Sequence, residues 1–320
     1  MHDAITDVPG IRVGHATDLE AITGCTVILC EGGAVGGADV RGSASGTREL
    51  DALDPLHLVP QCHAVVLAGG SAFGLDAAGG TMEFLEARGV GFDVGVTRVP
   101  IVPAAILFDL RIGRADVRPD RPMGRRAAEA AAAGPVAEGS VGAGTGATVG
   151  KLRGMAHAMK GGLGTAAEAL PGGVMVGALA AVNAFGDVLD AETGRILAGL
   201  RGPDGRPAGT AAAMRAGALR PGYAAESTTL AVVATNARLT KAQAAKLAAL
   251  AQNGIARAVS PAHTTFDGDL VFALATGQAE GDLNLIGTVA ADLVARAIAR
   301  GIKKAGSLGG IPAYADLQPH

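Results

Sequence analysis

Aromatic and charged residues are both scarce in this chain of 320 residues. Aromatics make up 3% with no tryptophan, and charged residues make up 18% with a net charge of −3. So little positive charge gives no basic surface of the kind that binds nucleic acid or anionic membranes. The few basic clusters, Arg125-Arg126 and Lys303-Lys304, are short and typical of solvated helix faces. We therefore expect neither nucleic acid nor a membrane among the partners.

Cysteine is scarce too, and long apolar runs are missing. Cys25, Cys30 and Cys62 do not have the spacing of metal ligands, and an odd number suits a reducing cytosol. The most apolar stretch, residues 174–185, has 12 residues and is too short to span a membrane. The first residues do not show a basic region followed by an apolar stretch. We expect a cytoplasmic protein.

What the chain has in quantity is small and aliphatic residues. Hydrophobic residues make up 49%, and 49 residues are glycine, so backbones can approach closely in a large core. Apolar runs predict strands, and Ala-rich periodic segments predict helices between them: strands at 63–68, 173–184, 229–234 and 270–275, and helices near 75–88, 240–252 and 285–305. Residues 187–193 are typical of a turn, and residues 201–218 of a linker or loop. Strands with returning helices predict α/β layers, here as one domain over 1–320.

Two glycine-rich stretches invite comparison with phosphate-binding loops. Residues 69–74 lie between a predicted strand and a predicted helix, but their glycine spacing is not G-x-G-x-x-G. Residues 142–151 end in Gly-Lys, yet Thr145 stands where the first glycine is required, and Leu152 replaces the magnesium-binding hydroxyl. We therefore interpret both stretches as loops whose glycines let the backbone pass close to a cleft. The alternative is a nucleotide-dependent α/β enzyme.

The most informative segment is residues 226–237, ESTTLAVVATNA. Two adjacent threonines, Thr228 and Thr229, precede a run that is typical of a buried strand. Taken alone, β-branched threonine at the start of a strand is common and needs no functional explanation.

The segment resembles the autocleavage strand of the DmpA family of self-processing aminopeptidases and amidases, which includes β-aminopeptidases and the nylon-oligomer hydrolase. Further blocks resemble the family in the same order along nearly the whole chain: PGIRVGH at 9–15, LAGGSAFGL at 67–75, VPAAILFD at 102–109, the stretch 142–151, Val182-Asn183, and HTTFDGD at 263–269. Each block is weak alone, but the ordered set is specific.

The resemblance implies a fold, a processing event and an activity. The implied fold is α/β, a four-layer α/β/β/α sandwich of the DmpA, N-terminal-nucleophile-like type. Cleavage between Ser227 and Thr228 would leave chains 1–227 and 228–320 associated, commonly as a tetramer of such pairs. The substrate would be a small peptide, amide or ester, with no metal and no organic cofactor required.

Thr228 is the implied nucleophile. Its hydroxyl would attack the carbonyl of Ser227, and an N-to-O acyl shift and hydrolysis would follow. The new α-amine has a reference pKa of roughly 7.7–8.0, so it can deprotonate the hydroxyl of the same residue near neutral pH. An internal threonine lacks this base, which couples processing to activity.

Four further residues are implied by their match to the family. Asn183 would hold the developing oxyanion, a task worth roughly 3 kcal/mol, and is otherwise a turn-capping residue. Lys151 would lower the pKa of the α-amine and support the oxyanion, and is otherwise a solvated loop lysine. Asp267 and Asp269 would orient the Thr228 amine and the Lys151 ammonium. The alternative is an ordinary Asp-Gly-Asp turn, and a calcium loop is not favoured because its remaining ligands are absent.

Two positions depart from the family pattern. Ser227 stands where close relatives usually carry Asn or Gly, so we expect self-cleavage to be slower or conditional. Phe108 replaces a tyrosine whose hydroxyl assists the site in characterised members, so that assistance is lost. An uncleaved, non-catalytic relative that binds peptides or a partner is therefore a third interpretation.

Overall fold

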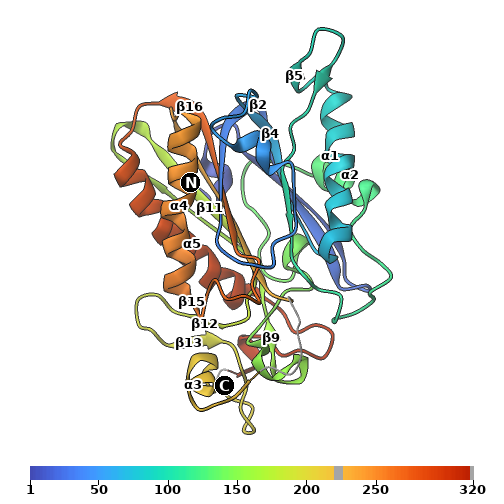
Figure 1. The fold of residues 1–320 in the computed structure, drawn as a ribbon, viewed down its shortest axis with the longest axis vertical. Helices are drawn as coiled ribbons and strands as arrows, with labels where there is room; N and C mark the ends of the chain where they lie inside the picture. The colour runs from blue at the N-terminus through green and yellow to red at the C-terminus, as the bar shows by residue number, and fades with distance from the viewer. Residues whose placement is uncertain (220–225, 318–320) are drawn as a thin grey trace.

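The computed structural model describes residues 1–219 and 226–317, and Figure 1 shows the strands in the middle of the molecule with helices on both sides. Its main strands are β1 (Arg12–Asp18), β2 (Thr23–Val40), β3 (Thr47–Arg48), β4 (Cys62–Ala68), β7 (Ala104–Ile106), β10 (Gly162–Ala169), β11 (Met175–Asn183), β14 (Thr228–Ala237) and β16 (Leu270–Ala279). Among the described residues these nine strands follow the order β10-β11-β14-β16-β2-β4-β7-β3, with β1 paired to β2.

Strand β2 joins two halves of this sheet. Its first part, residues 25–29, pairs with β1 and β4, and its last part, residues 35–40, pairs with β16. The pairing with β4 shifts register between Leu29 and Ala34, where the strand changes partners. Strand β2 thus belongs to both halves of the sheet. One half contains β1, β4 and β7, and the other contains β10, β11, β14 and β16.

The two halves pack face to face, and helices cover their outer faces. The helices are α1 (Ala77–Glu86), α2 (Arg121–Glu129), α3 (Thr210–Arg215), α4 (Lys241–Ala258) and α5 (Leu283–Lys304). Along β14, Leu230 and Val232 join the core between the sheets, whereas Ala231 and Val233 join the core under α4 and α5. Helices α1 and α2 cover the other half in the same way. The resulting α/β/β/α order confirms the predicted four layers (Figure 1).

The glycines predicted to allow close packing do so between β10 and α5. A Cβ atom on Gly162 or Gly164 would collide with the carbonyl oxygens of Gly301 and Ala297 on the helix. Only glycine lets the helix lie this close to the strand.

The predicted elements are largely confirmed, with two corrections. Helix α4 begins at the predicted cap Thr240, where Gln243 completes a capping box, and extends to Ala258. The predicted turn at 187–193 is wrong at its start, because β12 (Asp187–Leu189) pairs there with β13 (Ile196–Ala198) and β15 (Val259–Ser260). The predicted linker at 201–218 contains α3, whose first residue, Thr210, donates its hydroxyl to the buried Asp187 at 2.7 Å. A tertiary hydrogen bond of this kind leaves no local pattern in the sequence.

The remaining described strands form two small pairs. Strand β5 (Phe92–Asp93) pairs with β6 (Arg98–Val99), and β8 (Thr148–Val149) pairs with β9 (Met159–Lys160). Within residues 1–219 and 226–317, no helix has a stretch long and apolar enough to cross a bilayer.

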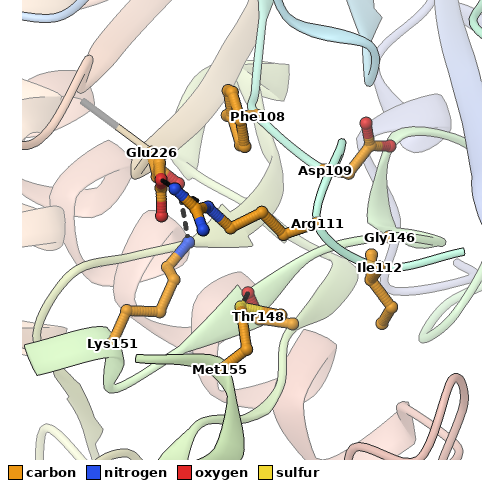
Figure 2. A pocket seen from close by; sticks show the side chains of 9 residues that line it. All are labelled: Phe108, Asp109, Arg111, Ile112, Gly146, Thr148, Lys151, Met155 and Glu226. Atoms are coloured by element: carbon orange, nitrogen blue, oxygen red, sulfur yellow. Dashed lines mark hydrogen bonds and ion pairs between the residues drawn. The ribbon is translucent and has the colours of Figure 1, made fainter. Parts of the chain in front are cut away.

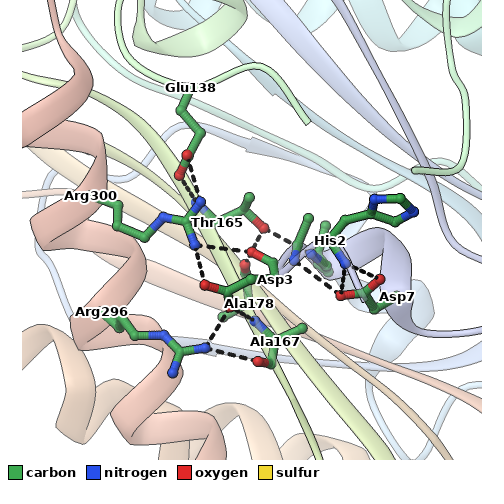
Figure 3. A network of polar contacts seen from close by, with 11 residues as sticks. His2, Asp3, Asp7, Glu138, Thr165, Ala167, Ala178, Arg296 and Arg300 are labelled. Carbon is green, nitrogen blue, oxygen red and sulfur yellow. Dashed lines mark hydrogen bonds and ion pairs between the residues drawn. The ribbon is translucent and has the colours of Figure 1, made fainter. Parts of the chain in front are cut away.

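The N-terminus is tied to helix α5 by ion pairs (Figure 3). Asp3 accepts from Arg296 and Arg300 at 2.6 Å each, and Glu138 accepts from Arg300 at 2.7 Å. These contacts join residues before position 227 to a helix after it.

Candidate active site

Three neighbouring strands bring most of the predicted site residues to one edge of the sheet. Asn183 is the last residue of β11 and lies opposite Thr228, the first residue of β14. Strand β16 runs parallel to β14, so the segment before it, with Asp267 and Asp269, reaches the same edge, where Asp267 pairs with Ser227. All of these residues are buried.

The peptide bond before Thr228 lies in a polarising environment. The Thr228 hydroxyl donates to the carbonyl oxygen of Ser227 at 2.5 Å. The backbone N–H of Gly268 donates to the same oxygen at 2.8 Å. Two donors on one carbonyl oxygen stabilise negative charge there, and one of them belongs to the predicted nucleophile.

Lys151 and Asn183 form a second donor group beside this bond. The Lys151 ammonium donates to the Asn183 main-chain and side-chain oxygens at 2.9 and 2.8 Å, and to the Glu226 carbonyl at 2.9 Å. Because Asn183 Oδ1 also accepts from the N–H of Thr148 at 3.0 Å, the amide oxygen must face these donors. Asn183 Nδ2 then points at the carbonyls of Glu226 and Phe108, at 3.2 and 3.1 Å.

The two aspartates hold the backbone around Thr228. Asp269 accepts from the N–H of Thr229 at 2.6 Å and from both the N–H and Nδ1 of His263 at 3.0 Å. Asp267 accepts from the N–H of Phe185 at 3.0 Å, and from Thr264 through its N–H and hydroxyl. These bonds fix the loop that carries Gly268 between the two aspartates.

The environment of Asp267 makes its carboxyl a weaker acid than an ordinary aspartate. Burial, with a further contribution from the charge of Asp269, raises the pKa of Asp267 to about 6.

Gly268 is required by the lack of space beside the Thr228 hydroxyl. A Cβ atom at this position would lie 2.8 Å from the Thr228 hydroxyl and 2.7 Å from the Ala44 carbonyl. In the sequence, Gly268 is only a glycine between two aspartates. Neither its role nor the hydrogen bonds from His263 to Asp269 could be predicted from the sequence.

The glycine-rich stretch 142–151 positions Lys151 and Thr148. Residues 142–150 are buried, and the ammonium of the fully buried Lys160 binds the carbonyls of Thr145 and Ala147 at 2.8 and 2.7 Å. A phosphate loop instead presents exposed N–H groups to its ligand. Burial lowers the pKa of Lys160 to about 7.

A small pocket opens beside the Lys151 ammonium (Figure 2). Its volume is about 10 Å³, room for roughly one water molecule. It is lined by Phe108, Asp109, Arg111, Ile112, Gly146, Thr148, Lys151, Met155 and Glu226. Phe108 thus lines the pocket with a ring that carries no hydroxyl, as expected from the sequence.

Arg111 is a pocket residue that the sequence pattern did not single out. Its Nε and Nη2 atoms both lie 2.5 Å from the carboxylate of Glu226, which stands 115 positions further along the chain. The nearby Asp109 carboxylate instead accepts from the N–H of Gly70 and the hydroxyl of Thr23, both at 2.7 Å.

Comparisons with known proteins agree with this architecture. The model of peptidase family S58 matches residues 3–314. An uncharacterised aminopeptidase of Mycobacterium tuberculosis is 43% identical, with 99% of this chain and 98% of that protein covered. A 6-aminohexanoate-oligomer endohydrolase of Kocuria sp. is 31% identical, with 85% and 74% covered.

Two solved structures show the same fold. The L-aminopeptidase D-Ala-esterase/amidase of Ochrobactrum anthropi, described as a variant of the Ntn hydrolase fold, superposes with a TM-score of 0.76 at 21% identity, covering 97% of this chain and 88% of that one. A β-aminopeptidase of Burkholderia sp. superposes with a TM-score of 0.70 at 24% identity, covering 98% and 91%.

Proposed function

Because this chain belongs to peptidase family S58, we propose that it is a self-processing amide hydrolase of the aminopeptidase and amidase type. It cuts its own chain between Ser227 and Thr228 and then uses Thr228 as the nucleophile. The observation that carries the proposal is the 2.5 Å contact between the Thr228 hydroxyl and the Ser227 carbonyl oxygen. The names of the relatives support the amide-cleaving activity.

Self-cleavage begins when Thr228 Oγ1 adds to the carbonyl carbon of Ser227. The Gly268 N–H stabilises the charge that develops on the carbonyl oxygen. The C–N bond then breaks, the nitrogen of Thr228 takes up the proton of the hydroxyl, and an ester remains. Water hydrolyses this ester to a Ser227 carboxylate and a Thr228 with a free amine and a free hydroxyl.

In the processed enzyme the Thr228 amine is the base for its own hydroxyl. The hydroxyl attacks an amide or ester carbonyl, and Asn183 Nδ2 and the Lys151 ammonium hold the oxyanion. Both groups already bind a carbonyl oxygen in the intact chain, that of Glu226, which supports their assignment as carbonyl-binding donors. The C–N or C–O bond of the substrate then breaks, and the amine or alcohol leaves with the proton that the Thr228 amine took from the hydroxyl. Water hydrolyses the remaining acyl-enzyme ester, which releases the acid and restores the Thr228 hydroxyl.

Asp267 and Asp269 act by positioning in this proposal. Asp269 holds the N–H of Thr229, the residue directly after the nucleophile, at 2.6 Å. Asp267 and Asp269 together set the orientation of the Gly268 N–H between them. We propose that they also orient the Thr228 amine and the Lys151 ammonium after cleavage, as the resemblance implies.

The chains 1–227 and 228–320 remain associated after cleavage. Strands β14 and β16 lie in the middle of the sheet, between β11 and β2 of the longer chain. Helix α5 adds the ion pairs to Asp3 and Glu138, although such partly exposed pairs contribute only about 0–1 kcal/mol each. We also propose that the processed pairs assemble into a tetramer. A cytoplasmic location is part of the proposal, because three free, buried cysteines suit a reducing compartment.

Mass spectrometry of the purified protein under denaturing conditions tests the cleavage. We expect two fragments that join at Ser227 and Thr228, and a single uncut species for Thr228→Ala. The Thr228→Ala protein should also fail to hydrolyse an aminoacyl p-nitroanilide. Cleavage and hydrolysis that persist in this variant would show that the nucleophile is another residue.

A further inference from the structure

Glu226 is bound in the intact chain as a ligand would be (Figure 2). Its main-chain carbonyl accepts from Lys151 at 2.9 Å and from Asn183 at 3.2 Å. Its carboxylate lies 2.5 Å from two nitrogens of Arg111. The Glu226 side chain is 6% exposed and that of Arg111 is 57% exposed, so the arginine stands at the mouth of the pocket and the carboxylate inside.

A substrate has to replace Glu226 at these groups. The donors that we assign to the substrate carbonyl are taken by the Glu226 carbonyl until the bond before Thr228 is cut and the new chain end moves away. When that end leaves, Arg111 loses its carboxylate partner as well. A glutamyl group has the same number of bonds between its carbonyl and its carboxylate as Glu226 has. It can therefore contact Lys151, Asn183 and Arg111 at once.

We propose that Arg111 determines the acyl specificity of the processed enzyme, which selects acyl groups that carry a carboxylate, with glutamyl the best fit. This inference rests on the proposed function and names the substrate class of the same site. Arg111 Nε and Nη2 both contact one carboxylate oxygen of Glu226, Oε1, and a charged oxygen held by two guanidinium N–H groups is bound more strongly than the oxygen of a neutral amide.

The rest of the pocket suits an acidic side chain with an apolar stem. Phe108, Ile112 and Met155 provide apolar walls. Asp109 does not compete for Arg111, because its two oxygens accept from Gly70 and Thr23 and point away from the guanidinium in Figure 2. The second cation of the pocket, Lys151, also favours an anionic ligand.

The test compares L-glutamyl-p-nitroanilide with its uncharged isostere, L-glutaminyl-p-nitroanilide. For the wild-type enzyme we expect kcat/KM to be at least about tenfold higher for the glutamyl substrate. In Arg111→Gln the ratio of the two kcat/KM values should fall to about one, mainly through loss of glutamyl turnover, and Arg111→Lys should restore part of the ratio. Arg114→Gln is the matched control, because Arg114 is similarly exposed but pairs with Asp116 outside the pocket.

Because Arg111 contacts Glu226 before cleavage, all rates are divided by the concentration of free Thr228 N-termini. A second measurement needs no variant: free L-glutamate should inhibit wild-type hydrolysis of a neutral aminoacyl substrate more strongly than L-glutamine does. Equal kcat/KM for the two substrates, or equal inhibition by the two amino acids, would overturn the inference in an active, processed enzyme. That result would leave the proposed function intact, whereas an uncut protein without hydrolysis would remove both.

Discussion

Replacement of Gly268 by alanine should slow self-cleavage without preventing folding. The backbone at Gly268 is not in the left-handed region, so alanine is compatible with its conformation. The added methyl group, however, would lie 2.8 Å from the Thr228 hydroxyl and 2.7 Å from the Ala44 carbonyl. One of these atoms must move, and the hydroxyl is held by its 2.5 Å contact to the Ser227 carbonyl oxygen, whose carbon we propose that it attacks.

The size of the effect follows from how strongly attack depends on geometry. Misplacement of a reacting group by about 1 Å can cost roughly 10²-fold in rate, or about 2.7 kcal/mol of activation free energy. A shift that also tilts the Gly268 N–H away from the Ser227 oxygen adds to this loss. Stability should fall by about 1–3 kcal/mol, the usual cost of an extra methyl group in a packed site.

The assay follows the fraction of uncut chain with time by mass spectrometry, in freshly purified wild-type and Gly268→Ala protein. Thermal unfolding monitors the fold. Gly32→Ala serves as the matched control, because Gly32 is an exposed glycine of β2 whose added methyl group would meet no atom within 4 Å. Self-cleavage of Gly268→Ala at the wild-type rate would refute the assignment of the Gly268 N–H and the Thr228 hydroxyl to this step.

Three further predictions concern the donors, the buried lysine and the residue before the cut. Asn183→Ala should reduce kcat for an aminoacyl p-nitroanilide by roughly 10²–10³-fold per free Thr228 N-terminus, and an unchanged kcat would exclude Asn183 as the oxyanion donor. Burial lowers the pKa of Lys160 to about 7 in the folded chain, against 10.5 in the unfolded chain. Between these pH values the unfolded state binds more protons than the folded state. The free energy of unfolding should therefore rise from pH 7 to 10.5, by up to roughly 5 kcal/mol. Urea unfolding at both pH values should show a smaller rise for Lys160→Met than for wild type, and equal slopes would contradict the assignment. Ser227→Gly should speed self-cleavage in the time-course assay, because the resemblance to the family implies Asn or Gly before the scissile bond, and slower cleavage would count against that explanation.

Much of the fold could be predicted because buried strands leave continuous apolar runs. Strand β14 is buried on both faces, and its run from Thr229 to Ala234 is visible in the sequence. Strand β2 was not predicted, because its 18 residues change partners midway and include several glycines. The sequence predicts a linker where α3 lies, because the carboxylate that accepts from the N–H and hydroxyl of Thr210 belongs to Asp187, 23 positions earlier in the chain.

The residues of the candidate site could be proposed from the sequence where their side chains would carry the chemistry. Thr228, Asn183, Lys151, Asp267 and Asp269 could be proposed from ordered motifs, and the structure brings them to one sheet edge. The Gly268 N–H could not, because a backbone donor leaves no side-chain signature. Nor could Arg111, since its partner Glu226 is distant in sequence and only the fold brings the two together.

We propose that hydrolysis depends on the free N-terminus of Thr228. Partly processed samples, taken at intervals after purification, allow amidase activity to be plotted against the fraction of chains that begin at Thr228. We expect a straight line through the origin, with no activity in uncut protein. Full activity in a sample whose chains are still joined at Ser227 and Thr228 would contradict it.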